Sequence, residues 1–464
     1  METVVMSFCG LCLLLVLGKL VRTAVPLFQR LYLPASVIGG LLGLLWINTL
    51  GKNMAPEWHS SWGALPGFLI NIVFAALFIG AKIPKMKTIW NEAAPQLCMG
   101  QLLAWGQYVI GLGLAAVLLI PLFGVNKAFG NLLEIGFEGG HGTVAGLTRT
   151  FEDFGWEAGI ALGYTMATIG MVLGITLGMA LINLAVRRGW VQNVRTFREQ
   201  TPHERIGIYP KHAQPPAGKQ TVQSESIDSL ALHIAALGMA VLIGYGLQQL
   251  LAYSNRFMPE CVQNLKILTS FPLFPLCLIG GLILQKFLLL VRLDSLVDQG
   301  QIQRLGGASL DFLVVAAVAS IRLDFVLAYW MPLLILAIGG TAWSIFMVLY
   351  IAPRLFEEAW FERSIAEFGQ GLGVTATGLL LLRTVDPDNN TPAAASFGYK
   401  QLLHEPIMGG GIWTSLALVL VFTRGIGEVW LISAGMLIFW LLFWRFVLRR
   451  RKKTAKVEIF HKTR

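Results

Sequence analysis

Long apolar segments alternate with short polar ones along the whole chain. Residues 68–79, 112–122, 276–284 and 331–351 are examples, and each lies in or makes up a stretch near the ~20 residues that a membrane-spanning helix needs. The pattern predicts an all-α polytopic membrane protein. Its expected spans lie near residues 2–20, 32–50, 66–82, 98–122, 158–186, 229–253, 266–290, 308–329, 331–352, 393–422 and 427–447.

Two further stretches, residues 128–150 and 360–383, are glycine-rich and too broken for a plain spanning helix. Irregular backbone at membrane depth is tolerated only where it is buried in protein or lines a water-filled cavity. We therefore expect both stretches to be re-entrant hairpins. The first would enter from outside the cell and the second from the cytoplasm.

Composition supports this class of protein. The chain is 55% hydrophobic and 13% charged, whereas a soluble domain has roughly 25% charged residues. Its 50 glycines suit close packing of membrane helices. The net charge of +10 does not indicate nucleic-acid binding, because nine of the 36 lysines and arginines lie in the last twenty residues and most others lie in short loops.

The distribution of lysine and arginine predicts an orientation. With the amino terminus outside, the inside loops hold 19 of these residues and the outside loops and span ends hold seven, before the nine in the tail are added. Cytoplasmic loops of membrane proteins carry the excess of positive charge. We therefore expect an outside amino terminus and a cytoplasmic carboxyl terminus in the plasma membrane.

Three landmarks recur in the same order in the two halves of the chain. Residues 34–41 recur at 275–282, residues 137–145 recur loosely at 368–376, and Asn71 corresponds to Asp311. With five spans and one hairpin in each half, the second copy would be inverted. The predicted parts are a first repeat (1–186), a cytoplasmic linker (187–228), a second repeat (229–423) and an extra helix with a basic tail (424–464).

The two glycine motifs are the strongest candidates for a binding site. Glycine lets a backbone turn sharply and approach a ligand closely. Broken helices there would offer free N–H groups to a carboxylate, and free C=O groups with Thr hydroxyls to a cation. The alternative is a pair of glycine-mediated helix crossings with no ligand. The motifs are Gly139-Gly140-His141-Gly142-Thr143 and Gly371-Leu372-Gly373-Val374-Thr375-Ala376-Thr377.

The region from Leu31 to Ala417 resembles the bacterial sodium/glutamate symporter family. The resemblance is carried by the two glycine motifs and by Leu33-Pro34, Gly39-Gly40-Leu41-Leu42, Phe78-Ile79-Gly80 and residues 170–178. It implies a sodium-coupled carrier of anionic amino acids in the bacterial inner membrane, built from two inverted five-helix repeats and forming a homodimer. Movement would be elevator-like by analogy with similar folds, and no cofactor beyond Na+ is expected.

From the motifs and the resemblance together we expect two sets of ligands. The substrate set is Glu138, Gly139, Gly140, His141, Gly142, Thr143, Gly371, Leu372, Gly373, Thr375 and Thr377. The cation set is Thr143, Thr375, Thr377, Asp311 and Thr414.

The chain departs from the family pattern at several positions. Glu138 stands where the family has a small hydroxyl residue, and Ala376 stands where it has a proline. Residues 414–417 replace acidic and amide residues, and the span at 427–447 goes beyond the family's ten. An ionised Glu138 would repel a second carboxylate on a substrate, so we expect this residue to influence which solute is accepted.

Other polar residues in the predicted spans have two interpretations each. Asn71 and Asp311 could line the site or could cap helix amino termini. Lys400, His404 and Glu405 could form a proton-carrying cluster, because buried charge in a membrane is costly and usually functional, or an interfacial cluster beside Pro406.

Three other functions were weighed against a sodium-coupled carrier. A proton-coupled carrier of a different solute and an ion channel remain alternatives. A membrane enzyme using Glu138 and His141 as an acid/base pair is disfavoured, because no nucleophile or metal set accompanies them.

Overall fold

The computed structural model describes residues 2–30, 33–51, 54–55, 57–81, 86–191, 201–259, 263, 271–386 and 390–448. These residues form helices and connecting turns, with no strand among them. Nine of the described helices are long and apolar enough to cross a membrane. They are Val5–Ala24, Ala93–Phe123, Ala158–Arg187, Ser229–Phe257, Leu273–Leu290, Gln299–Ala319, Trp330–Leu355, Trp360–Val385 and Ile426–Leu448. The polytopic all-α class is confirmed.

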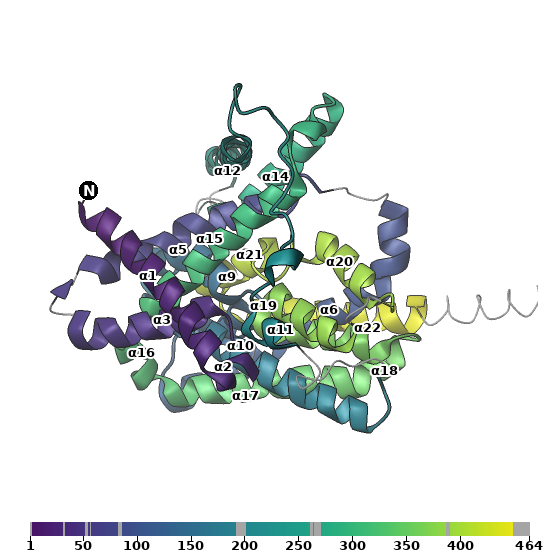
Figure 1. The fold of residues 1–464 in the computed structure, drawn as a ribbon. Coiled ribbons are helices and arrows are strands. Elements are labelled where there is room, and N and C mark those ends of the chain that lie inside the picture. Colours follow the sequence, from purple (N-terminus) through teal and green to yellow (C-terminus); the bar gives the residue numbers. More distant parts are fainter. Residues whose placement is uncertain are drawn as a thin grey trace, which may run out of the picture.

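One group of helices packs around the contact between α5 and α15. Its members are α1 (Glu2–Ala24), α3 (Ala35–Trp46), α5 (Glu57–Ala76), α12 (Ser229–Ser254), α14 (Leu273–Leu290) and α15 (Gln299–Ala319). Helix α1 packs on α3 and α3 packs on α15, while α12 packs on α14 and α14 packs on α5. In Figure 1 these helices lie toward the left and the top.

The recurring Gly-Gly pairs explain this packing. A Cβ atom at Gly39 would lie 2.4 Å from the Leu14 carbonyl oxygen of α1, and one at Gly280 would lie 2.1 Å from the Ala240 carbonyl oxygen of α12. The second glycine of each pair contacts a helix from the other half of the chain. Gly281 of α14, for example, approaches the Ala75 carbonyl oxygen of α5. Small residues are what let membrane helices approach this closely.

The other helices pack around α10 and α6. This second group contains α6 (Met86–Leu114), α8 (Leu132–Phe137), α9 (Gly140–Asp153), α10 (Ala158–Arg187), α17 (Trp330–Phe346), α19 (Trp360–Val385), α20 (Ala393–His404), α21 (Ile412–Thr423) and α22 (Ile426–Leu442). Helix α10 contacts α8, α9 and α19, and α6 contacts α20 and α22. Figure 1 shows α6, α20 and α22 toward the right.

Both glycine motifs break their helices. Between α8 and α9 the chain turns at Gly140, whose φ is +68°. Helix α19 is interrupted at Gly373 (φ −143°) and at Val374 (φ 60°, ψ 173°), a strained backbone conformation for a β-branched residue. The two parts of α19 fold back on each other, since a Cβ atom at Gly369 would lie 2.7 Å from Cα of Gly378. The membrane side from which each hairpin enters stays a prediction.

The span predicted over residues 393–422 is not continuous. Helix α20 ends at His404 and α21 begins at Ile412, so residues 405–411 interrupt it. Pro406 lacks an amide proton, and Gly409 and Gly410 take positive φ values of 66° and 104°. The apolar residues that flank this break on both sides predict one continuous helix, which is wrong here.

Two predicted spans begin too late in the sequence. Helix α5 begins at Glu57 and α15 begins at Gln299, so Asn71 and Asp311 lie well inside their helices. The interpretation of these two residues as amino-terminal caps is therefore wrong. The extra carboxyl-terminal helix is present as α22, which packs on α6.

Candidate functional site

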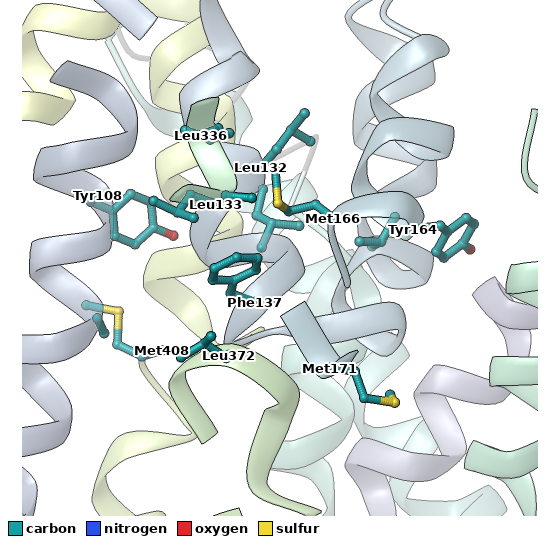
Figure 2. Close-up of a cluster of buried hydrophobic side chains, with 14 of the residues drawn as sticks. Tyr108, Leu132, Leu133, Phe137, Tyr164, Met166, Met171, Leu336, Leu372 and Met408 are labelled. Atoms are coloured by element: carbon teal, nitrogen blue, oxygen red, sulfur yellow. The ribbon is translucent and has the colours of Figure 1, made fainter. Parts of the chain in front are cut away.

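The two broken helices meet at their tips. A Cβ atom at Gly140 would lie 2.4 Å from Cγ1 of Val374, so the two breaks touch each other. Both tips rest on α10, where Gly170 faces the Leu372 carbonyl oxygen and the ring of Phe137. Figure 2 shows Phe137 and Leu372 close together within the buried apolar packing at this point. The contact joins segments from both halves of the chain.

A cavity of about 560 Å³ opens beside this contact. Pockets for small molecules have volumes in roughly this range. The wall combines apolar side chains from α5, α10 and α15 with the two hairpin tips and the break between α20 and α21. Polar residues on the wall are Ser36, Glu138, His141, Asp311, Gln370, Thr375, Thr377 and Glu405.

The cavity brings together most of the residues expected to bind ligands. Those on the wall are Glu138, Gly139, Gly140, His141, Gly142, Asp311, Gly373, Thr375, Thr377 and Glu405. Seven other expected residues are not on the wall: Asn71, Thr143, Gly371, Leu372, Lys400, His404 and Thr414.

The residues off the wall have other partners. The Thr143 hydroxyl donates to the Gly139 carbonyl oxygen at 2.9 Å. The Asn71 amide donates to the Gly67 carbonyl oxygen of its own helix at 2.9 Å. Each side chain is thus bonded to the backbone carbonyl four residues before it, and neither is on the cavity wall.

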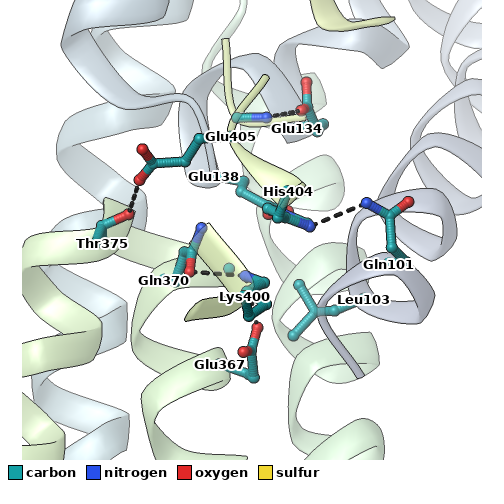
Figure 3. A network of polar contacts seen from close by, with 12 residues as sticks. Gln101, Leu103, Glu134, Glu138, Glu367, Gln370, Thr375, Lys400, His404 and Glu405 are labelled. Carbon is teal, nitrogen blue, oxygen red and sulfur yellow. Dashed lines mark hydrogen bonds and ion pairs between the residues drawn. The ribbon is translucent and has the colours of Figure 1, made fainter. Parts of the chain in front are cut away.

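His404 and Glu138 form a buried pair, with Glu138 on the cavity wall and His404 behind it. The Trp105 indole donates to Oε1 of Gln101 at 2.8 Å, so the Gln101 amide nitrogen faces Nδ1 of His404 at 3.1 Å. Nδ1 therefore accepts, and the proton of the neutral ring lies on Nε2. That nitrogen donates to Oε1 of Glu138. Figure 3 shows the contact between His404 and Gln101. The geometry thus holds Glu138 as a hydrogen-bond acceptor.

Lys400 is a completely buried lysine. Its Nζ lies 3.0 Å from Oε2 of Glu367 and donates to Oε1 of Gln370 at 2.9 Å. Gly100 makes room for it, since a Cβ atom there would lie 2.4 Å from Cε of Lys400. The other carboxylate oxygen of Glu367 accepts from the Gln96 amide at 2.7 Å. Figure 3 shows this ion pair one turn below His404 on α20.

Glu134 is a fully buried carboxylate on α8. It accepts from the Tyr108 hydroxyl at 2.7 Å, the Gly409 amide at 3.0 Å and the Thr414 hydroxyl at 2.8 Å. Three donors satisfy a buried carboxylate in place of a cation. Thr414, expected to bind a cation, instead fixes the break between α20 and α21 to the first hairpin.

The predicted cluster of Lys400, His404 and Glu405 is divided among three partners. Lys400 pairs with Glu367, His404 with Glu138, and Oε1 of Glu405 accepts from the Thr375 hydroxyl at 2.8 Å. Lys400 and His404 have no exposed surface, and the helix break follows directly after His404. Whether the cluster lies at the membrane interface stays a prediction. Proton transfer by the cluster stays a prediction.

Several functional residues were missed at the sequence level. Glu134 and Glu367 are acidic residues inside apolar segments. An ionisable residue at such a position is a candidate functional residue for that reason alone. Glu134 also stands four residues before Glu138, on the same helix face. Gln96 and Gln101 carry no such signal, because an amide in a membrane helix is common.

The fold and the cavity define a polytopic membrane protein with a solute-sized site between broken helices. Residues 2–386 match the family described as sodium/glutamate symporter. The match covers most of the chain, which therefore belongs to the sodium/glutamate symporter family. None of the individually curated proteins matches the chain. Helices α20, α21 and α22 lie beyond the matched residues.

Proposed function

We propose that the protein is a cation-coupled secondary transporter that carries a small amino acid or organic anion across the plasma membrane. The family supplies sodium as the expected coupling ion and glutamate as the reference solute. The observation that carries the proposal is the contact between the two hairpin tips at Gly140 and Val374, beside a cavity of about 560 Å³. Breaks in membrane helices at such a cavity are the usual binding sites of secondary transporters.

Corresponding helix contacts support the inverted-repeat plan. Helix α1 packs on α3 as α12 packs on α14, and α3 packs on α15 as α14 packs on α5. The broken segment at Gly140 corresponds in the same way to the one at Val374. An inverted repeat places one hairpin on each side of the membrane, which a carrier with alternating access needs. We propose a homodimer in the bacterial inner membrane on the family resemblance alone.

Uptake into proteoliposomes tests the transporter. We expect saturable accumulation of at least one member of a panel of L-glutamate, L-glutamine, L-ornithine and glutarate, driven by an inward sodium gradient and lost when potassium replaces sodium. A channel would let the solute equilibrate without a gradient. Equilibration without accumulation, or chemical conversion of the solute, would contradict the proposal.

Proton coupling is the second candidate. The buried pair of His404 and Glu138 favours it, because both side chains can exchange a proton and Glu138 also lines the cavity. Uptake driven by an imposed pH gradient in sodium-free buffer would identify protons, in place of sodium, as the coupling ion. If uptake is not driven by the pH gradient but is still driven by sodium, then sodium is the coupling ion.

The topology gives a separate prediction. Ser226 lies in the exposed segment before α12 and the exposed Met258 follows the same helix, so the 26 residues of α12 place them on opposite membrane faces. In a cysteine-free background, Ser226→Cys is expected to resist a membrane-impermeant maleimide in intact cells and to react after permeabilisation. Met258→Cys, the matched control, should react in intact cells. The opposite labelling of the two variants would invert the proposed orientation.

A further inference from the structure

The described cavity wall contains three acidic residues and neither a lysine nor an arginine. The acidic residues are Glu138, Asp311 and Glu405. The nearby ammonium group of Lys400 lies behind the wall and is already held by Glu367 and Gln370. A dicarboxylate entering this cavity would therefore meet negative charge without a basic side chain to balance it.

Glu138, on the cavity wall, has a buried carboxylate oxygen without a hydrogen-bond partner among the described residues. The residue is 4% exposed and lines the cavity. Its Oε1 is bonded to His404, and its Oε2 has no hydrogen-bond partner within the described structure. An unpaired buried carboxylate oxygen costs free energy unless a ligand supplies a donor. A solute that brings a hydrogen-bond donor to this oxygen would therefore be stabilised there.

Two other polar side chains on the wall, His141 and Thr375, are also acceptors. The Thr168 hydroxyl donates its one proton to the Tyr164 carbonyl oxygen at 2.9 Å, so it accepts from Nε2 of His141 at 3.0 Å. This tautomer leaves Nδ1 of His141 as an acceptor. The Thr375 hydroxyl uses its one proton to donate a hydrogen bond to Glu405, so its oxygen can only accept from a solute. A solute with several N–H donors matches these groups.

Backbone donors remain for one carboxylate. The first amides of a helix have no partner within it and carry partial positive charge. Two such helix starts border the cavity, at Gly140 in α9 and at Thr375 in the second part of α19. The cavity thus combines acceptors for an ammonium group with donors for a single carboxylate.

We propose that the cavity selects amino acids that carry no net negative charge, with the ammonium group at Glu138 and Glu405 and the carboxylate at the hairpin tips. The inference rests on the proposed function and narrows it, because glutamate falls outside the preferred class. Glu405 and Gly409 come from the segment beyond residue 386, where the family match ends. This part of the wall can therefore differ from the family while the rest agrees.

Four solutes of similar length separate the charge classes. L-Ornithine carries a net charge of +1, L-glutamine 0, L-glutamate −1 and glutarate −2. We expect ornithine and glutamine to raise the thermal unfolding midpoint of the purified protein and to compete for uptake. Glutamate should bind about tenfold or more weakly than glutamine, and glutarate more weakly still, because each added negative charge faces partly dehydrated carboxylates.

Charge-neutralising variants test the assignment of residues. Glu405→Gln and Glu138→Gln are each expected to raise the affinity for glutamate relative to glutamine by about tenfold. Two variants are used because Glu138 is also bonded to His404, and its replacement could disturb the fold. The matched control is Glu157→Gln, an exposed acid away from this cavity, which should leave the ratio unchanged.

Binding and transport distinguish the two proposals. If glutamine or ornithine binds but none of the four solutes accumulates, the proposed substrate class is supported and the proposal that the protein is a transporter is contradicted. Accumulation of glutamate or glutarate in preference to glutamine would overturn the substrate class and leave the transporter intact. Failure of all four to bind would also overturn the class, and so would an unchanged ratio in both variants at Glu138 and Glu405.

Discussion

Replacing Lys400 with methionine is expected to lower the free energy of unfolding by about 3–5 kcal/mol. The change removes the only cation within 3.0 Å of Glu367 among the described residues and leaves that carboxylate buried. Desolvation makes an unpaired charge far more destabilising than the loss of one surface contact. Thermal and denaturant unfolding in detergent, followed by tryptophan fluorescence, measures the loss.

Two further variants identify the cause. Adding Glu367→Gln to Lys400→Met removes the uncompensated charge and should recover most of the stability, since the glutamine can still bond to Gln96. Lys211→Met, at an exposed lysine of the linker, should change stability by less than about 0.5 kcal/mol. Wild-type stability in Lys400→Met would show that Glu367 does not depend on the ammonium group.

Replacing Gly140 with alanine should reduce uptake by about tenfold or more. Its φ of +68° costs a residue with a side chain roughly 1–2 kcal/mol. The new Cβ atom would also lie 2.4 Å from Cγ1 of Val374, so the hairpin tips must separate. A barrier raised by about 1.4 kcal/mol slows a step tenfold. Uptake per correctly inserted molecule in proteoliposomes is the measurement.

The effect at Gly140 should depend on the contact with Val374. Val374→Ala, added to Gly140→Ala, relieves the clash and should restore part of the uptake. Gly238→Ala is the matched control, because it lies in α12 and a Cβ atom there meets nothing within 4 Å. Equal uptake by Gly140→Ala and the wild type would mean that transport does not require the tips to touch.

The apolar pattern predicted the straight helices well, because a membrane span must be both long and apolar. It failed at residues 405–411, where the break is short and the chain continues apolar on both sides. Breaks at Gly140 and Gly373 were predicted because each glycine motif recurs, and a repeat gives independent evidence for each copy.

The polar network was predicted only in part. Lys400, His404 and Glu138 stood out as ionisable residues in apolar segments, but the sequence could not pair them. Their partners come from helices far apart along the chain, and one sequence contains no record of such contacts. Glu138 was singled out as a residue beside the glycine motif and lies on the cavity wall, whereas its bond to His404 depends on how α20 packs against the first hairpin.

The order in which the chain is synthesised gives the network of acids a further consequence. Glu138 precedes its partner His404 by 266 residues, and Glu134 precedes its donors Gly409 and Thr414 by 275 and 280 residues. At about 5–20 residues per second, both carboxylates wait roughly 15–50 s for these partners after insertion begins. A nascent first half therefore holds incompletely bonded acids at the translocon. A chain truncated before α20 never buries them correctly, so membrane quality control should degrade it even though its apolar spans are intact.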